Sequence, residues 1–198
     1  MANTNPRHVV TGKARFSYEH VMQPYRNPNS RSDSEPRYSL TVLVPKSDTA
    51  TKARIDAAIK AALKWGEDRK VFRDGTPLDR LPIPVYDGDG YRADGFTEFG
   101  KECKGMWVFT ASTPMNKPPQ VVDAARNPII NTTDVYSGCW GRVGVDFFPY
   151  NQGSKQGIGC SLCNVQKLAD DTPLGSSRPT ADEDFSEPTA MEVFDPLS

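Results

Sequence analysis

The chain has 198 residues, of which 37% are hydrophobic and 25% charged, with a formal net charge of −1. This length favours one domain with its own core, and no apolar run approaches the roughly 18 residues that a membrane-spanning helix needs. The near-neutral charge conceals a division, because residues 169–198 contain eight acidic residues and one Arg, whereas the rest contain 23 Lys and Arg against 17 Asp and Glu. We therefore expect a basic domain over 1–168 and a flexible acidic tail over 169–198.

Two segments of alternating polarity open the chain. The segment from His8 to Tyr18 predicts a strand with one core face and one basic face, and Arg37 to Val44 predicts a second strand after a loop rich in Pro and Ser. The residues expected in the core are Val10, Ala14, Phe16, Tyr18, Tyr38, Leu40, Val42 and Val44. Lys13, Arg15 and Arg37 are expected on the outside.

An amphipathic helix is predicted next. Ser47 or Asp48 can cap its start, and apolar residues recur at spacings of three and four as far as about Trp65. The segment 66–104 has many Gly, Pro and charged residues and no sustained period, which predicts a long irregular excursion.

Four more strands are predicted after this excursion, over 106–112, 120–123, 138–150 and 157–167. The last two are expected to form a hairpin across a polar turn. Short strands joined by irregular loops, with a single helix, favour a mainly β fold. We expect one OB-like antiparallel barrel of five to six strands, with one amphipathic helix, long irregular loops and a disordered acidic tail.

The strand over 138–150 carries the main functional signal. Its alternation directs Val143, Val145 and Phe147 inward, which leaves Trp140, Arg142, Phe148 and Tyr150 on the outer face. Exposed rings are unfavourable unless something covers them, and stacked nucleic-acid bases with Arg at the phosphates would do so. The helix, a loop or a partner chain could cover them instead. Further candidates for contacts to the nucleic-acid backbone are Lys13, Arg15, Arg37, Lys117 and Lys155, and Trp107 is either a stacking platform or a core residue.

Metal sites and enzymatic activity receive weaker support. Cys160 and Cys163 have the spacing of zinc ligands, with Cys103 and Cys139 as potential partners, but within a regular strand their sulfurs point to opposite faces. We therefore expect free thiols. The acidic residues Asp87, Asp89, Asp94 and Glu98 imitate a calcium loop imperfectly and leave a magnesium-dependent nuclease open as an alternative. Because motifs of nucleophilic or metal-dependent enzymes are otherwise absent, we expect no catalytic residue, metal or cofactor.

Several sequence blocks, in their order, resemble the single-stranded DNA-binding proteins of tailed phages and prophages. These blocks are VVTGKARFSY, PRYSLTVLVPKSD, KPPQVVD, YSGCWGRVGVDFFPYN and GIGCSLCNVQKLADDTPLG followed by ADEDF. The resemblance implies an OB fold with an acidic C-terminal tail. It also implies sequence-independent binding of single-stranded DNA in phage replication and recombination, where the tail competes for the DNA groove and recruits replication proteins.

The expected function is therefore to coat and protect single strands in the cytoplasm of a bacterial host. A protein-interaction module of a phage replication complex is the alternative, in which DNA binding has no physiological role. The sequence leaves open the oligomeric state, a homodimer included, and the preference for DNA over RNA.

Overall fold

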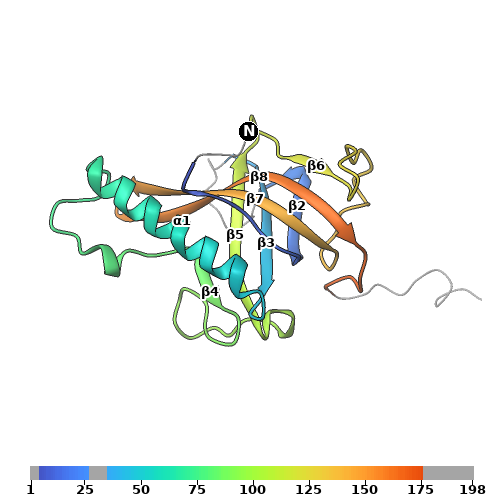
Figure 1. Cartoon of the computed structure of the whole chain (residues 1–198), viewed down its shortest axis with the longest axis horizontal. Helices are drawn as coiled ribbons and strands as arrows, with labels where there is room; N and C mark the ends of the chain where they lie inside the picture. The colour runs from blue at the N-terminus through green and yellow to red at the C-terminus, as the bar shows by residue number, and fades with distance from the viewer. Residues whose placement is uncertain (1–4, 27–34, 176–198) are drawn as a thin grey trace, which may run out of the picture.

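The computed structural model describes residues 5–26 and 35–175. Within these ranges the protein is mainly β, with one α-helix (Figure 1). The strands are β1 (His8–Val10), β2 (Ala14–Tyr25), β3 (Arg37–Pro45), β4 (Val85–Asp87), β5 (Met106–Pro114), β6 (Gln120–Val122), β7 (Trp140–Gln152) and β8 (Lys155–Ala169), and the helix is α1 (Thr49–Asp68). Single 3-10 turns cover Leu78–Arg80 and Lys101–Cys103. Most of the predicted acidic tail lies outside the described residues.

The five longest strands pair in a closed sequence. β7 pairs with β2, β2 with β3, β3 with β5, β5 with β8, and β8 returns to β7 in a long hairpin. The short strands β1, β4 and β6 add to β7, β5 and β8 respectively. The predicted hairpin is confirmed, but the prediction of a purely antiparallel sheet is wrong, because β5 and β6 pair with β8 in parallel.

Helix α1 lies across the front of Figure 1 and contacts β7, β1 and β8. Asp48 caps it as predicted, since its carboxylate accepts hydrogen bonds from the Thr51 amide at 2.9 Å and the Thr51 hydroxyl at 2.6 Å. Ile55, Ala58 and Ala62 on one helix face are buried. This face closes the core between α1 and the sheet.

The core contains most of the residues that alternation assigned to it. The confirmed residues are Ala14, Phe16, Leu40, Val42, Val44, Val143, Val145 and Phe147, all with 1% exposure or less. Tyr38 is half-buried. Phe109 is also buried, and its ring lies 6.3 Å from that of Phe147.

Two predicted core residues are exposed, Val10 by 44% and Tyr18 by 62%. The predicted first strand breaks at residues 11–13, so β1 pairs with β7 in its own register and buries Val9 in place of Val10. Tyr18 has a positive φ of 45°, and the pairing of β2 with β3 shifts register just after Ser17. This bulge turns the Tyr18 side chain out of the core.

Residues 66–104 are mostly irregular, as predicted, and beyond the end of α1 they contain only β4 and the two 3-10 turns as regular structure. In the part of the chain that the structure describes, no helix combines the length and apolar character needed to cross a membrane.

Candidate nucleic-acid interface

Side chains from five strands form one row on the outer face of the sheet. Directly paired residues of adjacent strands direct their side chains to the same face. The strand registers place in this row, from one edge to the other, Trp140, Arg15, Leu43, Val108 and Tyr86. The outer face therefore carries an aromatic residue at each end and a guanidinium near one of them.

A groove of about 660 Å³ crosses this face. Its lining comes from β2, β3, β5, the end of the β7–β8 hairpin and the irregular segment around β4. A second hollow of about 390 Å³ continues it along β2, since the two share Tyr18, Arg37, Thr41, Thr110 and Ser112. The groove is thus an extended trough, a shape that suits a linear ligand better than a compact one.

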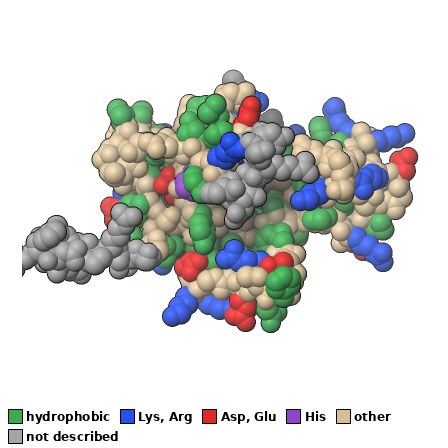
Figure 2. All heavy atoms as spheres, turned by 180° about the vertical axis from the view of Figure 1, so that it is seen from behind, with side chains coloured by type: hydrophobic (Ala, Val, Ile, Leu, Met, Phe, Trp, Pro, Cys, Tyr) green, Lys and Arg blue, Asp and Glu red, His purple; other side chains and the backbone are tan. Residues whose placement is uncertain are grey.

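Aromatic side chains line the whole length of the trough. Phe148 is 38% exposed and Tyr150 lies beside it on the same wall. Tyr86 and Phe99 form another wall, with ring centroids 6.2 Å apart. In the second hollow, the Tyr25 ring stacks on the His20 ring with their centroids 4.3 Å apart. The trough therefore has flat ring surfaces at several points along its length. Figure 2 shows hydrophobic side chains and Lys or Arg side chains lying close together on the face opposite to α1.

The centre and rim of the trough provide cations and hydroxyls. The Nε of Arg37 donates a hydrogen bond to Ser112 Oγ at 3.3 Å, which holds the guanidinium over β5. The Arg92 guanidinium lies 5.4 Å from the Phe99 ring. The hydroxyls of Thr41 and Thr110 are 2.9 Å apart across β3 and β5. Aromatic planes with guanidinium groups and hydroxyls between them are the elements that bind the bases and backbone of a single strand.

Trp140 lies at one end of the row and is surrounded by charge. The Lys13 ammonium is 5.1 Å and the Arg15 guanidinium 6.0 Å from its ring centre. Its Nε1 donates a hydrogen bond to Asp171 Oδ2 at 2.7 Å, and this bond, more than the nearby cations, holds the Asp171 pKa below its usual value. An acidic residue therefore already occupies the polar edge of this ring.

The segment 170–174 continues along the same end of the sheet. Arg15 donates to the Thr172 carbonyl at 2.8 Å, and the Leu174 amide donates to the Ser137 carbonyl at 2.7 Å. The Leu174 side chain packs against the cluster of Leu43, Cys103 and Val108, part of which lines the trough. The described start of the acidic tail thus contacts the interface directly.

The acidic residues that suggested a cation site are arranged differently from a metal cage. Lys46 Nζ pairs with Asp87 at 2.5 Å and with Asp89 at 2.6 Å, so an ammonium group already lies between these carboxylates. Asp94 accepts hydrogen bonds from the amides of Phe96 and Thr97 in its own loop. In the described ranges, the one group of three or more His, Cys, Asp and Glu side chains that could hold a metal ion is His8, Asp146 and Cys163.

Comparison with known proteins identifies the family. The family model of the ssDNA-binding protein of Enterobacter phage Enc34 matches residues 7–194. The chain belongs to this family of phage single-stranded DNA-binding proteins.

Solved structures of phage single-stranded DNA-binding proteins are similar along most of the chain. The protein from bacteriophage Enc34 in complex with ssDNA has a TM-score of 0.69 and 28% identity, covering 85% of this chain and 90% of that one. A second structure of the Enc34 protein has a TM-score of 0.66 and 28% identity, covering 91% and 90%. Gp2.5 of bacteriophage T7, at 13% identity and a TM-score of 0.55 over 87% and 95%, shares the fold. A search of curated proteins gave no match.

The predicted site residues of this family member lie in three places. Arg37, Phe148 and Tyr150 line the trough. Lys13, Arg15 and Trp140 form a cluster at one end of the row, outside the lining of the trough. Arg142 is exposed on the same strand as Trp140 and donates to the Thr11 carbonyl. Lys155 begins β8 at the hairpin turn, paired with Gln152 of the trough wall, and Lys117 lies in the turn after β5. Their roles in binding DNA remain predictions.

Trp107 lies apart from the other predicted site residues. It is half-buried against the core, and the ammonium groups of Lys46 and Lys52 lie 5.1 and 4.5 Å from its ring. Alternation along β5 puts it on the same face as the buried Phe109, whereas Val108 is on the opposite face, where it pairs with Tyr86. Its ring is therefore already covered by cations on the side of the sheet that faces α1.

Sequence reasoning did not find several residues of the trough. Tyr18 was assigned to the core because the bulge in β2 gives no signal in the alternation. Tyr86, Arg92 and Phe99 lie in the irregular segment, where no period predicts a face. The composition of that segment did contain a signal. Aromatic residues in a loop that is otherwise rich in Gly, Pro and charged residues indicate a functional surface.

Proposed function

We propose that this protein binds single-stranded DNA without sequence preference along the trough, and that it coats and protects single strands during phage DNA replication and recombination. The observation that carries the proposal is the set of aromatic rings along the trough, together with the guanidinium groups of Arg37 and Arg92 that line it. A relative of the same family, the Enc34 protein, has been solved in complex with ssDNA. The closed sequence of β7, β2, β3, β5 and β8 supports our assignment of an OB barrel.

Binding would proceed by charge capture followed by stacking. Lys13, Arg15 and Arg37 attract the phosphate backbone, and the release of condensed counterions favours the complex. Bases then stack on rings such as Phe148 and Tyr150, which contributes about 1–3 kcal/mol for each stacked base whatever its identity. We assign no covalent step, cofactor or catalytic residue to this reaction.

The acidic tail would act as a competitor for the same surface. Asp171 contacts Trp140 and lies 3.7 Å from Arg15, so a DNA phosphate approaching Arg15 meets a carboxylate already there. When DNA displaces the tail, the acidic segment becomes available to replication proteins of the phage or its host. This exchange links occupancy of the DNA site to recruitment of partners.

The test is a fluorescence-anisotropy titration of labelled oligo-dT with the full chain at several salt concentrations. We expect salt-dependent binding with a log–log slope of about −0.7 for each phosphate contacted. The double variant Trp140→Ala and Tyr150→Ala should lose most of this binding and keep its circular dichroism spectrum. Binding that is absent, or that survives the double substitution unchanged, would favour a protein-interaction module.

The tail's role needs a second comparison. A chain that ends at Gly175 keeps the contacts of Asp170 and Asp171, whereas one that ends at Leu168 loses them. Tighter DNA binding by both shortened chains would support competition by the whole acidic segment, and tighter binding by the second alone would limit it to the docked residues. Equal affinity of all three chains would remove competition from the proposal.

A further inference from the structure

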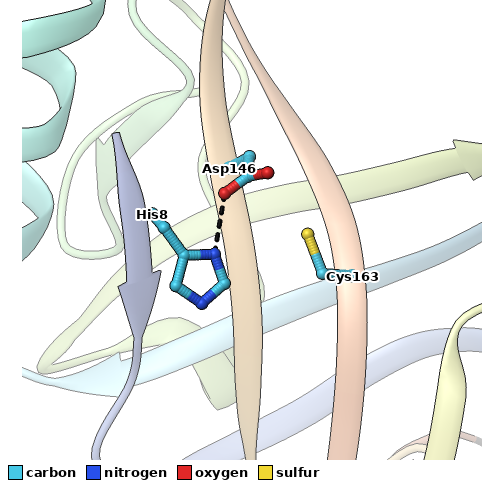
Figure 3. Close-up of side chains that lie close together, drawn as sticks. All are labelled: His8, Asp146 and Cys163. Atoms are coloured by element: carbon cyan, nitrogen blue, oxygen red, sulfur yellow. Dashed lines mark hydrogen bonds and ion pairs between the residues drawn. The ribbon is translucent and has the colours of Figure 1, made fainter. Parts of the chain in front are cut away.

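A second cluster of chemically active side chains lies outside the trough. His8 on β1, Asp146 on β7 and Cys163 on β8 direct their side chains toward one another from three neighbouring strands (Figure 3). The described lining of the trough contains none of the three. The DNA-binding proposal therefore leaves this cluster without a role.

The strand registers explain why the three side chains meet. His8 and Asp146 are direct partners in the pairing of β1 with β7. On the other side of β7, Gly144 pairs with Asn164 and the next residue, Val145, with Leu162, so Cys163 is an extra residue of β8. Asp146 pairs directly with Ser161, and Cys163, two residues further along β8, lies on the same face as Ser161. The bulge leaves Cys163 without a direct partner on β7, with its thiol on the Asp146 side of the strand pair.

The donor atoms are close enough for one metal ion to bridge them after small side-chain movements. His8 Nδ1 lies 2.7 Å from Asp146 Oδ1, and all three donor atoms lie within 4.8 Å of one another. Tetrahedral zinc, with bonds of about 2.0–2.3 Å, holds its ligand atoms roughly 3.3–3.8 Å apart. We propose that His8, Asp146 and Cys163 form a Zn²⁺ site, with water as the fourth ligand.

The chemistry of the donors selects zinc among common divalent ions. Magnesium and calcium prefer oxygen donors alone, whereas an imidazole nitrogen, a carboxylate and a thiolate together match borderline-soft zinc. A neutral imidazole with one carboxylate and one thiolate also balances the two charges of the ion. Burial raises the pKa of the Cys163 thiol to about 11, so zinc binding near neutral pH releases the thiol proton to solvent.

Zinc ligation would change the hydrogen bonding of the His8 ring. The His8 ring lies beside Gly144, and a Cβ at that position would be in ordinary van der Waals contact with the ring, at 3.5 Å. In the zinc-bound form Nδ1 presents its lone pair and Nε2 carries the ring proton, which exchanges the present hydrogen bond to Asp146 for a shared metal ion. The site would fasten β1, a strand of only three residues, to both strands of the β7–β8 hairpin.

Cobalt(II) is the direct probe, because its absorption bands report tetrahedral geometry and ligation by sulfur. We expect the full chain to bind one Co²⁺ with a thiolate-to-metal charge-transfer band, and Zn²⁺ to displace it. Free zinc at 100-fold over its dissociation constant should raise the Tm by about 5–10 °C. DNA affinity should not change, so this result is independent of the proposed function.

Variants show whether these three residues are the ligands. Cys163→Ser should abolish the charge-transfer band, and His8→Gln should weaken Co²⁺ binding at least tenfold. His20→Gln is the matched control, because His20 stacks on Tyr25 in another part of the fold. Circular dichroism of each metal-free variant checks that it is folded. A chain without tetrahedral cobalt bands, or bands that persist in Cys163→Ser, would overturn the proposal and leave His8 and Asp146 as a structural hydrogen-bonded pair.

Discussion

The Trp140 indole donates a 2.7 Å hydrogen bond to the carboxylate of Asp171. This contact links Trp140, which the sequence predicts to contact nucleic acid, to the beginning of the acidic tail. Tyr136 adds to the attachment by donating to Asp170 at 2.9 Å, and Lys167 pairs with Asp170 at 2.7 Å. The tail therefore begins with specific, directional contacts at one end of the interface.

Replacing Asp171 by Asn tests whether this contact opposes DNA binding. The substitution removes a negative charge beside Arg15 and keeps an oxygen that can accept from Trp140. We expect about two- to fivefold tighter binding of oligo-dT at low salt, with the difference shrinking as salt screens the charge. Asp68→Asn, which removes a carboxylate paired with Lys64 on α1, is the control for the change in net charge. Equal effects of the two variants would attribute the gain to net charge alone.

Removing the Phe148 ring should weaken DNA binding with little loss of stability. The ring is 38% exposed and packs over Gly159 on the wall of the trough, so its apolar face is available to a base. Phe148→Ala should weaken oligo-dT binding by about 5- to 150-fold, the equivalent of one stacked base. Phe96→Ala provides the comparison, because Phe96 is 77% exposed and is not part of the trough lining. If both variants bind alike, Phe148 is not a stacking platform.

Arg37 should contribute to affinity through phosphate contact. It lines both parts of the trough and is oriented by Ser112. Arg37→Ala should make the log–log salt slope less steep by about 0.7, the value for one phosphate on a single strand. Lys60→Ala, on the exposed surface of α1, should leave the slope unchanged. A weaker complex with an unaltered slope would indicate that Arg37 stacks on a base and does not bind phosphate.

Alternation predicted the parts of the fold in which one face of a strand is buried along its whole length. It placed Phe16, Val42 and Phe147 in the core and Phe148 outside, because a regular strand changes face at every residue. It failed at Tyr18, since a bulge inserts a residue into the strand and inverts the parity that follows. Alternation did place Cys160 and Cys163 on opposite faces of their strand, but the pairing of β1 with β7 that brings His8 to Asp146 is a long-range contact with no local signal.

The assembly of the interface also depended on contacts that no local pattern records. Trp140 and Phe148 share a strand and a parity, but Trp140 lies beside Asp171 at one end of the sheet while Phe148 lines the trough. Tyr86 reaches the trough because β4 pairs with β5, and the Phe99 ring lies beside the Tyr86 ring. The type of residue at the site was therefore predictable from the sequence, and its distribution along the trough was not.

Glu19 should destabilise the folded protein at neutral pH. Burial raises the pKa of this half-buried carboxyl above its usual 4.5, although hydrogen bonds from the backbone oppose the shift. A raised folded pKa means that ionisation favours the unfolded state, so the destabilisation is present above the folded pKa and disappears as pH falls below 4.5. Glu19→Gln should therefore raise the Tm at pH 7, with the difference vanishing near pH 4.

The control for this measurement is Glu67→Gln, which changes an exposed residue of α1. In the Glu19→Gln variant the new side-chain amide retains an oxygen that can accept from the Val21 amide, as the Glu19 carboxylate now does at 2.6 Å. A lower Tm for this variant at pH 7 would mean that the hydrogen bonds to the carboxylate outweigh its desolvation. Thermal unfolding followed by circular dichroism across pH 4–8 distinguishes the two results.

Asp48 should stabilise the protein as the N-cap of α1. Its carboxylate accepts from the amide and the hydroxyl of Thr51, and these bonds lower its pKa below the usual 3.8. Asp48→Ala should cost about 0.5–2 kcal/mol, or a Tm lower by about 1–8 °C. Asp48→Asn keeps a capping oxygen and should lose much less. Because the pKa is lowered, the stabilisation should persist at neutral pH and decline only as pH falls below 3.8. Equal losses of stability in the two variants at pH 7 would show that the carboxylate charge contributes more than the capping hydrogen bonds.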